Sequence, residues 1–195
     1  MRGVVPFERS ESTGLRVDLD FSKNHFELFG LPVSFTVDEA ALADRYQSLQ
    51  RALHPDRYAS GTERERRLSM QGASLVNEAY QVLRAPLARA GYLLSLQGID
   101  LDTERDTRMD PAFLMQQMEL REQLDDARNA ADGLDRLDRL QDELRAAQRT
   151  LSGEVGALLD AADWQAARDA VRRWQFLDKL SREADDVAAS LEDAL

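Results

Sequence analysis

Apolar residues recur at helical spacing along most of the chain, and no segment shows the strict alternation of a half-buried strand. In the stretch 36–53, four apolar residues follow one another at intervals of four, three and four: Leu42, Tyr46, Leu49 and Leu53. A second apolar face of this kind runs through the stretch 62–84. These two patterns predict amphipathic helices that pack their apolar faces together as an antiparallel hairpin.

Two capping boxes mark the predicted starts of these helices. Thr36 is followed by Glu39 and Thr62 by Glu65, which is the spacing at which paired side chains satisfy the N–H groups of a first helical turn. Between the helices, Pro55 disfavours helical geometry at the residue before it, so the first helix should end there. The hairpin should therefore carry residues 54–56 at an exposed tip.

The tripeptide His54-Pro55-Asp56 has several interpretations: a catalytic dyad, half of a metal site, a surface that another protein recognises, or a turn whose Asp caps the next helix. Residues two apart around a proline rarely form a hydrogen-bonded dyad, and no nucleophile is evident at this tip. Only two histidines and no cysteine are present, which argues against a metal site. A bare tripeptide would favour the turn. His25 is expected to be an ordinary helix-start residue, and Asn77 to bond locally.

Behind residue 85 the sequence predicts a short helix over 86–97 and three longer ones. Asp110-Pro111 is a favourable helix start, and that helix should run to about Arg128. A second helix covers 134–159, where leucines recur every seven residues, and a third runs from about 163 to 191. We therefore predict an all-α protein with a disordered tail (1–23), a hairpin domain (24–85), a connecting helix (86–98) and a three-helix bundle (99–195), which begins with a polar loop (99–109).

The helix that starts at Asp110 has two apolar stripes. At roughly 100° per residue, one stripe falls within about 40° and contains Phe113, Leu120 and Leu124. The other lies about 100° to 200° away and contains Leu114, Met115 and Met118, flanked by Glu119 and Glu122. Since a helix in a small bundle has one core side, the second stripe should be partly exposed, as a partner-binding patch would be. From periodicity alone, a wide core face is an equally good interpretation.

Composition and charge narrow the class of protein. The 195 residues are 43% hydrophobic and 31% charged, as in a globular protein, and the formal net charge is −11. Residues 37–84 contain seven acidic and seven basic residues, whereas 85–195 contain 24 acidic and 14 basic ones, a net charge of −10. This acidic half would repel a phosphate backbone, which argues against nucleic acid as a partner. No apolar run is long enough for a membrane span, and the start lacks the apolar core of a signal peptide, so a cytoplasmic location is expected.

Several blocks resemble a known module in the right order. The segments "HFELFGLP", "HPD" and "LVNEAYQVL", with a predicted helix between the first two, are similar to a J-domain, through which co-chaperones address DnaK-type ATPases. The blocks "HPDRYASG", "RAGYLLSLQG", "FLMQQMELREQLDD" and "FLDKL" further resemble the HscB family of J-proteins, which is dedicated to iron–sulfur cluster assembly. This resemblance covers nearly the whole chain after residue 23.

The resemblance implies a co-chaperone and not an enzyme. A DnaK-type chaperone of the HscA kind would dock on the tip and the helix before it, at positions matching His54, Pro55, Asp56, Arg45, Arg51 and Arg57. An iron–sulfur scaffold protein of the IscU kind would bind at Leu114, Met115, Met118, Glu119, Glu122 and Phe176. No cofactor, metal, nucleic acid or membrane partner is implied. Two other hypotheses stay open, a J-protein with a different client and a purely structural helical adaptor.

Overall fold

The computed structural model describes residues 20–101 and 110–193, and within these ranges it contains helices and no strand. The predicted tail and the predicted polar loop lie mostly outside the described residues. The elements, in chain order, are α1 (His25–Phe29), α2 (Glu39–Ala52), the 3-10 turn η1 (Pro55–Tyr58), α3 (Glu63–Arg84), α4 (Pro86–Leu96), α5 (Pro111–Asn129), α6 (Gly133–Asp160) and α7 (Trp164–Glu192). The predicted all-α class is confirmed.

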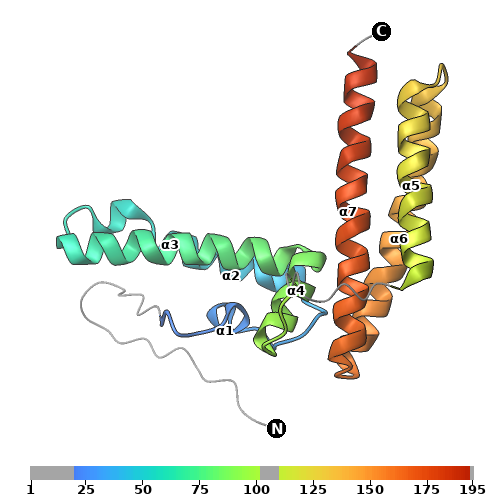
Figure 1. Cartoon of the computed structure of the whole chain (residues 1–195). Coiled ribbons are helices and arrows are strands. Elements are labelled where there is room, and N and C mark those ends of the chain that lie inside the picture. Colours follow the sequence, from blue (N-terminus) through green and yellow to red (C-terminus); the bar gives the residue numbers. More distant parts are fainter. Residues whose placement is uncertain (1–19, 102–109, 194–195) are drawn as a thin grey trace.

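Helices α2 and α3 form the predicted antiparallel hairpin (Figure 1). The Tyr46 hydroxyl donates to the Asn77 side chain at 2.9 Å, and the Ser69 hydroxyl donates to the Leu53 carbonyl at 2.7 Å. Contacts that advance along α2 therefore go backwards along α3, as antiparallel helices require. The short helix α1 closes one side of the hairpin, because both of its phenylalanines are buried.

One of the two predicted capping boxes is correct and the other is wrong. The Thr62 hydroxyl accepts from the Glu65 N–H, and the Glu65 carboxylate accepts from the Thr62 N–H at 2.9 Å, as expected. Thr36 caps nothing, because α2 begins at Glu39 and the carboxylate of Asp38 accepts from the first-turn N–H of residue 41 at 3.0 Å. Asp is at least as good an N-cap as Thr, and Asp38 stands directly before the helix.

Helices α5, α6 and α7 form the predicted three-helix bundle (Figure 1). The heptad leucines of α6 face its interior: Leu137, Leu144 and Leu151 are buried and Leu158 is partly buried. A tight turn joins α6 to α7, in which the Asp163 N–H donates to the Leu158 carbonyl at 3.0 Å. Ala162 adopts a left-handed backbone there, with φ of 55°.

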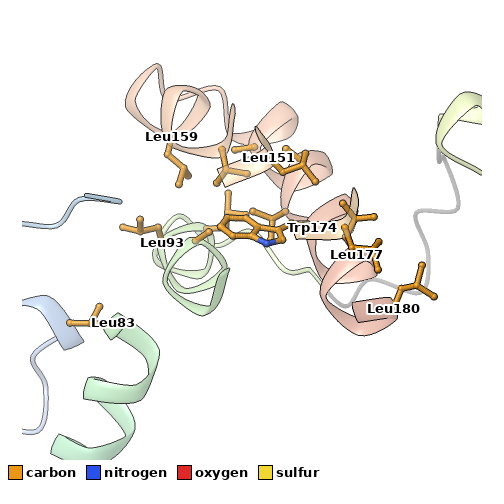
Figure 2. Packing of buried hydrophobic residues seen from close by; sticks show 14 of the residues in the cluster. Leu83, Leu93, Leu151, Leu159, Trp174, Leu177 and Leu180 are labelled. Atoms are coloured by element: carbon orange, nitrogen blue, oxygen red, sulfur yellow. The ribbon is translucent and has the colours of Figure 1, made fainter. Parts of the chain in front are cut away.

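Helix α4 lies between the hairpin and the bundle (Figure 1). Its buried face, formed by Ala90, Leu93 and Leu94, packs against α3 on one side and α7 on the other. Figure 2 places Leu93 in one packed group with Trp174 of α7 and Leu159 of α6. The apolar core is consequently continuous from α1 to α7.

A buried arginine completes this joint. The guanidinium of Arg89 on α4 donates to the Leu83 carbonyl near the end of α3, and it lies over the ring of Phe35, 5.4 Å from the centroid. Burial lowers the pKa of Arg89, although the charge of Glu39 opposes this shift. Phe35 in turn lies against Gly156 of α6, where a Cβ would be 3.0 Å from a ring carbon. The loop before α2 thus contacts the bundle directly, and the tip of the hairpin extends away from the bundle (Figure 1).

Candidate functional site

The tip of the hairpin is shaped by the end of α2. The last carbonyl groups of a helix have no partner within it, so other groups must satisfy them. Here three side chains of the following segment do so. The Arg57 guanidinium donates to the Arg51 carbonyl (3.4 Å), the Tyr58 hydroxyl to the Ala52 carbonyl (3.4 Å) and the Ser69 hydroxyl to the Leu53 carbonyl (2.7 Å). The turn η1 is thereby held against the helix end, and residues 54–56 remain on the outside.

His54 and Asp56 are both open to solvent, with side chains 59% and 90% exposed. The His54 Nδ1 accepts from the backbone N–H of Asp56 at 3.3 Å, so in the neutral ring Nε2 carries the proton. The Asp56 carboxylate is 3.5 Å from the same Nδ1, which has no hydrogen to donate to it in this tautomer, so the carboxylate does not orient the ring as the Asp of a catalytic triad does. The tip therefore lacks the geometry of a catalytic dyad, and both side chains lie open at the surface.

The three arginines assigned to docking do not form one basic face. Arg51 and Arg57 lie together at the tip, where the Arg57 guanidinium contacts the Arg51 carbonyl. Arg45 is six residues earlier on α2, about 120° around the helix from Arg51, and its guanidinium approaches Gly30 after α1, 3.7 Å from a Cβ built there. The structure thus brings two of the three arginines to the tripeptide.

Further basic residues near the tip were not among the predicted ones. The first turns of α3 add Arg64, Arg66 and Arg67, and Arg67 pairs with Glu63 at 3.3 Å. The charge run "ERERR" in the sequence was the available signal for them. Since Ser69 of α3 contacts Leu53, which lies between α2 and the tripeptide, these side chains start at the level of the tripeptide.

The prediction that Asn77 bonds locally is wrong. Its side chain crosses from α3 to α2, where it accepts from the Tyr46 hydroxyl at 2.9 Å and from the Gln50 amide. The Tyr46 ring also stacks on Tyr80 of α3, with centroids 4.0 Å apart. These cross-helix contacts arise because the antiparallel arrangement places residues 46 and 77 at the same level. They hold the two helices in register below the tip.

On α5 the two stripes separate as the spacing predicts. Phe113, Leu120 and Leu124 are buried, whereas Leu114, Met115 and Met118 are 43%, 64% and 71% exposed. We call these three exposed residues the α5 patch. The alternative interpretation of a wide core face is therefore wrong. Glu119 and Glu122 are exposed beside the patch, so it is an apolar surface with an acidic rim.

Phe176 of α7 is only half-buried, and it lies beside α5. Its ring meets Phe113 edge-on, with centroids 5.7 Å apart and an interplanar angle of 88°. The guanidinium of Arg121 covers it at 5.6 Å from the centroid. Arg121 is three residues after Met118 on α5, so it links Phe176 to the α5 patch. The sequence did not single out Arg121.

His25, expected to be an ordinary helix-start residue, anchors α1 to α4. Its ring stacks on Tyr92 with centroids 4.2 Å apart, and its backbone N–H donates to the Tyr92 hydroxyl at 2.9 Å. Burial lowers the pKa of His25, and the charge of Glu78 opposes this shift.

Among the described residues, no three His, Asp or Glu side chains are placed to hold a metal ion. No helix in the described part of the chain has the length and apolar character needed to cross a bilayer.

Comparison with known proteins decides the family. Residues 109–185 match the family model described as the HSCB C-terminal oligomerisation domain. The Co-chaperone protein HscB homolog of Cupriavidus taiwanensis is 50% identical over 168 residues, which cover 86% of this chain and 95% of that protein. The homolog of Burkholderia vietnamiensis is 48% identical over 169 residues, covering 87% and 94%. This chain belongs to the HscB family of co-chaperones.

Solved structures agree with this assignment. The chaperone HscB from Vibrio cholerae superimposes with a TM-score of 0.77 at 41% identity, covering 87% of this chain and 99% of that one. The human co-chaperone HscB gives a TM-score of 0.80 at 28% identity, covering 94% and 93%. The predicted architecture, an N-terminal J-domain followed by a C-terminal helical domain, is confirmed. The hairpin and α1 are the J-domain, and α5 to α7 are the C-terminal domain.

Proposed function

We propose that this HscB-family protein is a non-enzymatic helper that stimulates ATP hydrolysis by a DnaK-type, HscA-like chaperone and delivers an IscU-like iron–sulfur scaffold protein to it in the cytoplasm. The observation that carries the proposal is the pairing of two exposed surfaces on one continuous core. The first is the hairpin tip, and the second is the α5 patch. The cluster is cargo of the scaffold, and the ATPase chemistry belongs to the chaperone.

Docking of the chaperone is assigned to His54, Pro55 and Asp56 with Arg51 and Arg57. The two ionisable side chains of the tripeptide point to solvent, and no described contact competes with a partner for the Asp56 carboxylate except the 3.5 Å approach of His54. The neighbouring arginines offer long-range attraction to an acidic partner surface. Arg45, which lies toward α1, is assigned a smaller role.

Binding of the scaffold is assigned to the α5 patch with Glu119, Glu122 and Phe176. Three contiguous exposed apolar side chains with a charged rim are typical of a partner-binding surface. Met side chains adapt their shape to a partner, which suits them to the centre of such a surface. Phe176 contributes the exposed part of its ring at the edge of the α5 patch.

The docking assignment is tested by the steady-state ATPase rate of the chaperone. His54→Gln and Asp56→Asn each remove a group from the tip without truncating a buried side chain, and both should abolish the stimulation. Asp142→Asn is the matched control, because Asp142 on α6 is also an exposed acid, 80% exposed, and is remote from the tip in sequence. Undiminished stimulation by the tip variants would exclude the docking assignment.

The arginines allow a finer test of the same surface. Arg51→Ala and Arg57→Ala should each slow association with the chaperone, most strongly at low ionic strength, because screening weakens attraction between exposed charges. Arg45→Ala should have a smaller effect, since its guanidinium lies toward Gly30. Equal effects of all three substitutions would show that the docking surface extends to α1.

The scaffold assignment is tested by titration with the scaffold protein. Truncating each residue of the α5 patch to alanine removes roughly 1 kcal/mol or more of apolar burial in the complex. The triple variant should therefore bind at least about a hundredfold more weakly. Met70→Ala is the matched control, because Met70 is 60% exposed on α3. Unchanged affinity of the triple variant would show that the scaffold does not bind through the α5 patch.

A further inference from the structure

The methionines in the described part of the chain lie at the surface. Three of its five methionines lie in the described residues, and all three are exposed: Met70 (60%), Met115 (64%) and Met118 (71%). The chain has no cysteine, so thioethers are its oxidisable sulfur groups. Two of the three belong to the α5 patch, three residues apart on one side of the helix. Two of the three apolar side chains of the α5 patch thus contain oxidisable sulfur.

We propose that Met115 and Met118 are an oxidative modification site, at which peroxides switch off binding of the scaffold. This inference rests on the proposed function of the α5 patch. Conversion of the two thioethers to sulfoxides turns an apolar surface into a polar one. Delivery of the scaffold would then stop under oxidising conditions and resume once the sulfoxides are reduced.

The chemical step is an oxygen transfer. The methionine sulfur attacks one oxygen of the peroxide, so that an S–O bond forms and the O–O bond breaks. Sulfur is oxidised by two electrons, and hydrogen peroxide is reduced to water by proton transfer from its own attacked oxygen to the departing one. The protein supplies no proton. A thioether has no ionisable hydrogen, so its reactivity depends on exposure and not on a shifted pKa, in contrast to a cysteine.

The exposure of Met115 and Met118 also determines whether oxidation affects folding or binding. In the free protein both sulfoxides remain hydrated, because the side chains are about two-thirds exposed, and the folded state loses little. In the complex the sulfoxide oxygen must leave water and face a surface shaped for a thioether. An unpaired polar group of this kind weakens binding by about tenfold, or about a hundredfold for both methionines. Binding is therefore affected strongly and folding weakly.

Binding of the scaffold should in turn protect the two methionines from oxidation. A bound scaffold covers the α5 patch, so Met115 and Met118 should be oxidised in the free co-chaperone and protected in the complex. Met70 lies on α3 in the J-domain and serves as an internal reference. Scaffold should slow oxidation at positions 115 and 118 and leave position 70 unchanged. Equal rates at all three positions would contradict the inference.

The experiment uses the full chain. The co-chaperone is treated alone with hydrogen peroxide, the peroxide is removed, sulfoxides are mapped by mass spectrometry, and scaffold affinity is measured. We expect sulfoxide at 115 and 118, an affinity lowered by about a hundredfold, an unchanged helical circular dichroism spectrum, and recovery after treatment with methionine sulfoxide reductases. The double variant Met115→Leu/Met118→Leu has no thioether in the α5 patch, so its scaffold affinity should be the same before and after peroxide treatment.

The outcomes separate this inference from the proposed function. If the triple alanine variant of the α5 patch binds scaffold like the unaltered protein, the proposed function is wrong. If binding depends on the patch but persists when 115 and 118 are sulfoxides, the modification inference is wrong. Loss of binding by the peroxide-treated leucine variant would also overturn the inference, because the sensitive group would then lie elsewhere.

Discussion

Replacing Gly156 by alanine probes the joint between the J-domain and the bundle. The alanine Cβ would lie 3.0 and 3.3 Å from two ring carbons of Phe35, closer than ordinary carbon contacts of about 3.5 to 4.0 Å. The guanidinium of Arg89 lies over the same ring, 5.4 Å from its centroid. The ring must therefore move, and the movement reaches the α4 joint. Gly153, one turn earlier on the same helix, has no atom within 4 Å of such a Cβ and is the matched control.

The magnitudes follow from two opposing effects. Glycine in a helix interior costs roughly 0.5 to 1 kcal/mol relative to alanine, so Gly153→Ala should raise the free energy of unfolding by about that amount. Gly156→Ala has the same gain, but overpacking of a tight contact costs about 1 to 3 kcal/mol. The two variants should therefore differ by about 1 to 3 kcal/mol, with Gly156→Ala the less stable. For a chain of this size that is a difference in Tm of roughly 2 to 12 °C.

Urea and thermal unfolding followed by circular dichroism measure both variants. We expect Gly153→Ala to unfold at a higher midpoint than the unaltered protein and Gly156→Ala at an equal or lower one. The double substitution Gly156→Ala/Phe35→Leu should recover part of the loss, because the smaller side chain leaves room for the methyl group. Equal stabilisation by Gly153→Ala and Gly156→Ala would refute the reasoning, since it would mean that Phe35 does not pack on α6.

Three further predictions concern single contacts. Burial lowers the pKa of His25 below its ordinary value of 6.5, so the unfolded chain binds more protons and the free energy of unfolding should fall as the pH falls through 6.5. His25→Phe keeps the stacking on Tyr92 and should remove this part of the pH dependence from unfolding curves recorded between about pH 5.5 and 7.5. An unchanged pH dependence in this variant would count against the burial of His25 beside Tyr92. Ala162→Gly should raise the free energy of unfolding by up to about 1 kcal/mol, because glycine tolerates the left-handed turn, and a lower midpoint in urea would contradict this. Asn77→Ala should lower the free energy of unfolding by about 0.5 to 1.5 kcal/mol, because it removes the hydrogen bonds to α2. A double-mutant cycle with Tyr46→Phe should show coupling between the two positions.

The helices could be predicted from periodicity because each has a buried face at regular spacing. Their ends were less certain where two capping residues compete. Thr62 stands directly before α3 with Glu65 as its partner, and its box was predicted correctly. Thr36 has a rival in Asp38, which lies closer to the apolar run and forms the cap. Spacing alone does not rank two such candidates.

The exposed stripe of α5 could be predicted because a helix in a three-helix bundle buries one side. The spacing of about 100° per residue therefore placed Leu120 on the buried side and Met118 on the exposed side correctly. Which side of α2 each arginine occupies relative to α1 depends on tertiary packing. For that reason the sequence named Arg45 and Arg51 as candidates but gave no sign that the Arg45 guanidinium lies toward Gly30.

The joint lay beyond sequence reasoning. Arg89 is the one charged residue of α4, a type of side chain that usually lies at the surface, yet it is buried against Phe35 and the end of α3. The contact between Phe35 and Gly156 joins positions more than a hundred residues apart. Local periodicity contains no information about such pairs, because they form only when two complete domains meet. The orientation of the tip relative to the bundle therefore required the structure.

The central claim is that one molecule presents both surfaces to the same chaperone. The most direct measurement is the ATPase rate of the chaperone in the presence of scaffold and of two defective co-chaperones, His54→Gln and the triple alanine variant of the α5 patch, separately and mixed. One variant retains the scaffold surface and the other retains the docking tip, so every group is present in the mixture. We predict that the mixture stays far below the unaltered protein at equal concentration. Full restoration by the mixture would contradict the account, because the two surfaces would then work without being joined.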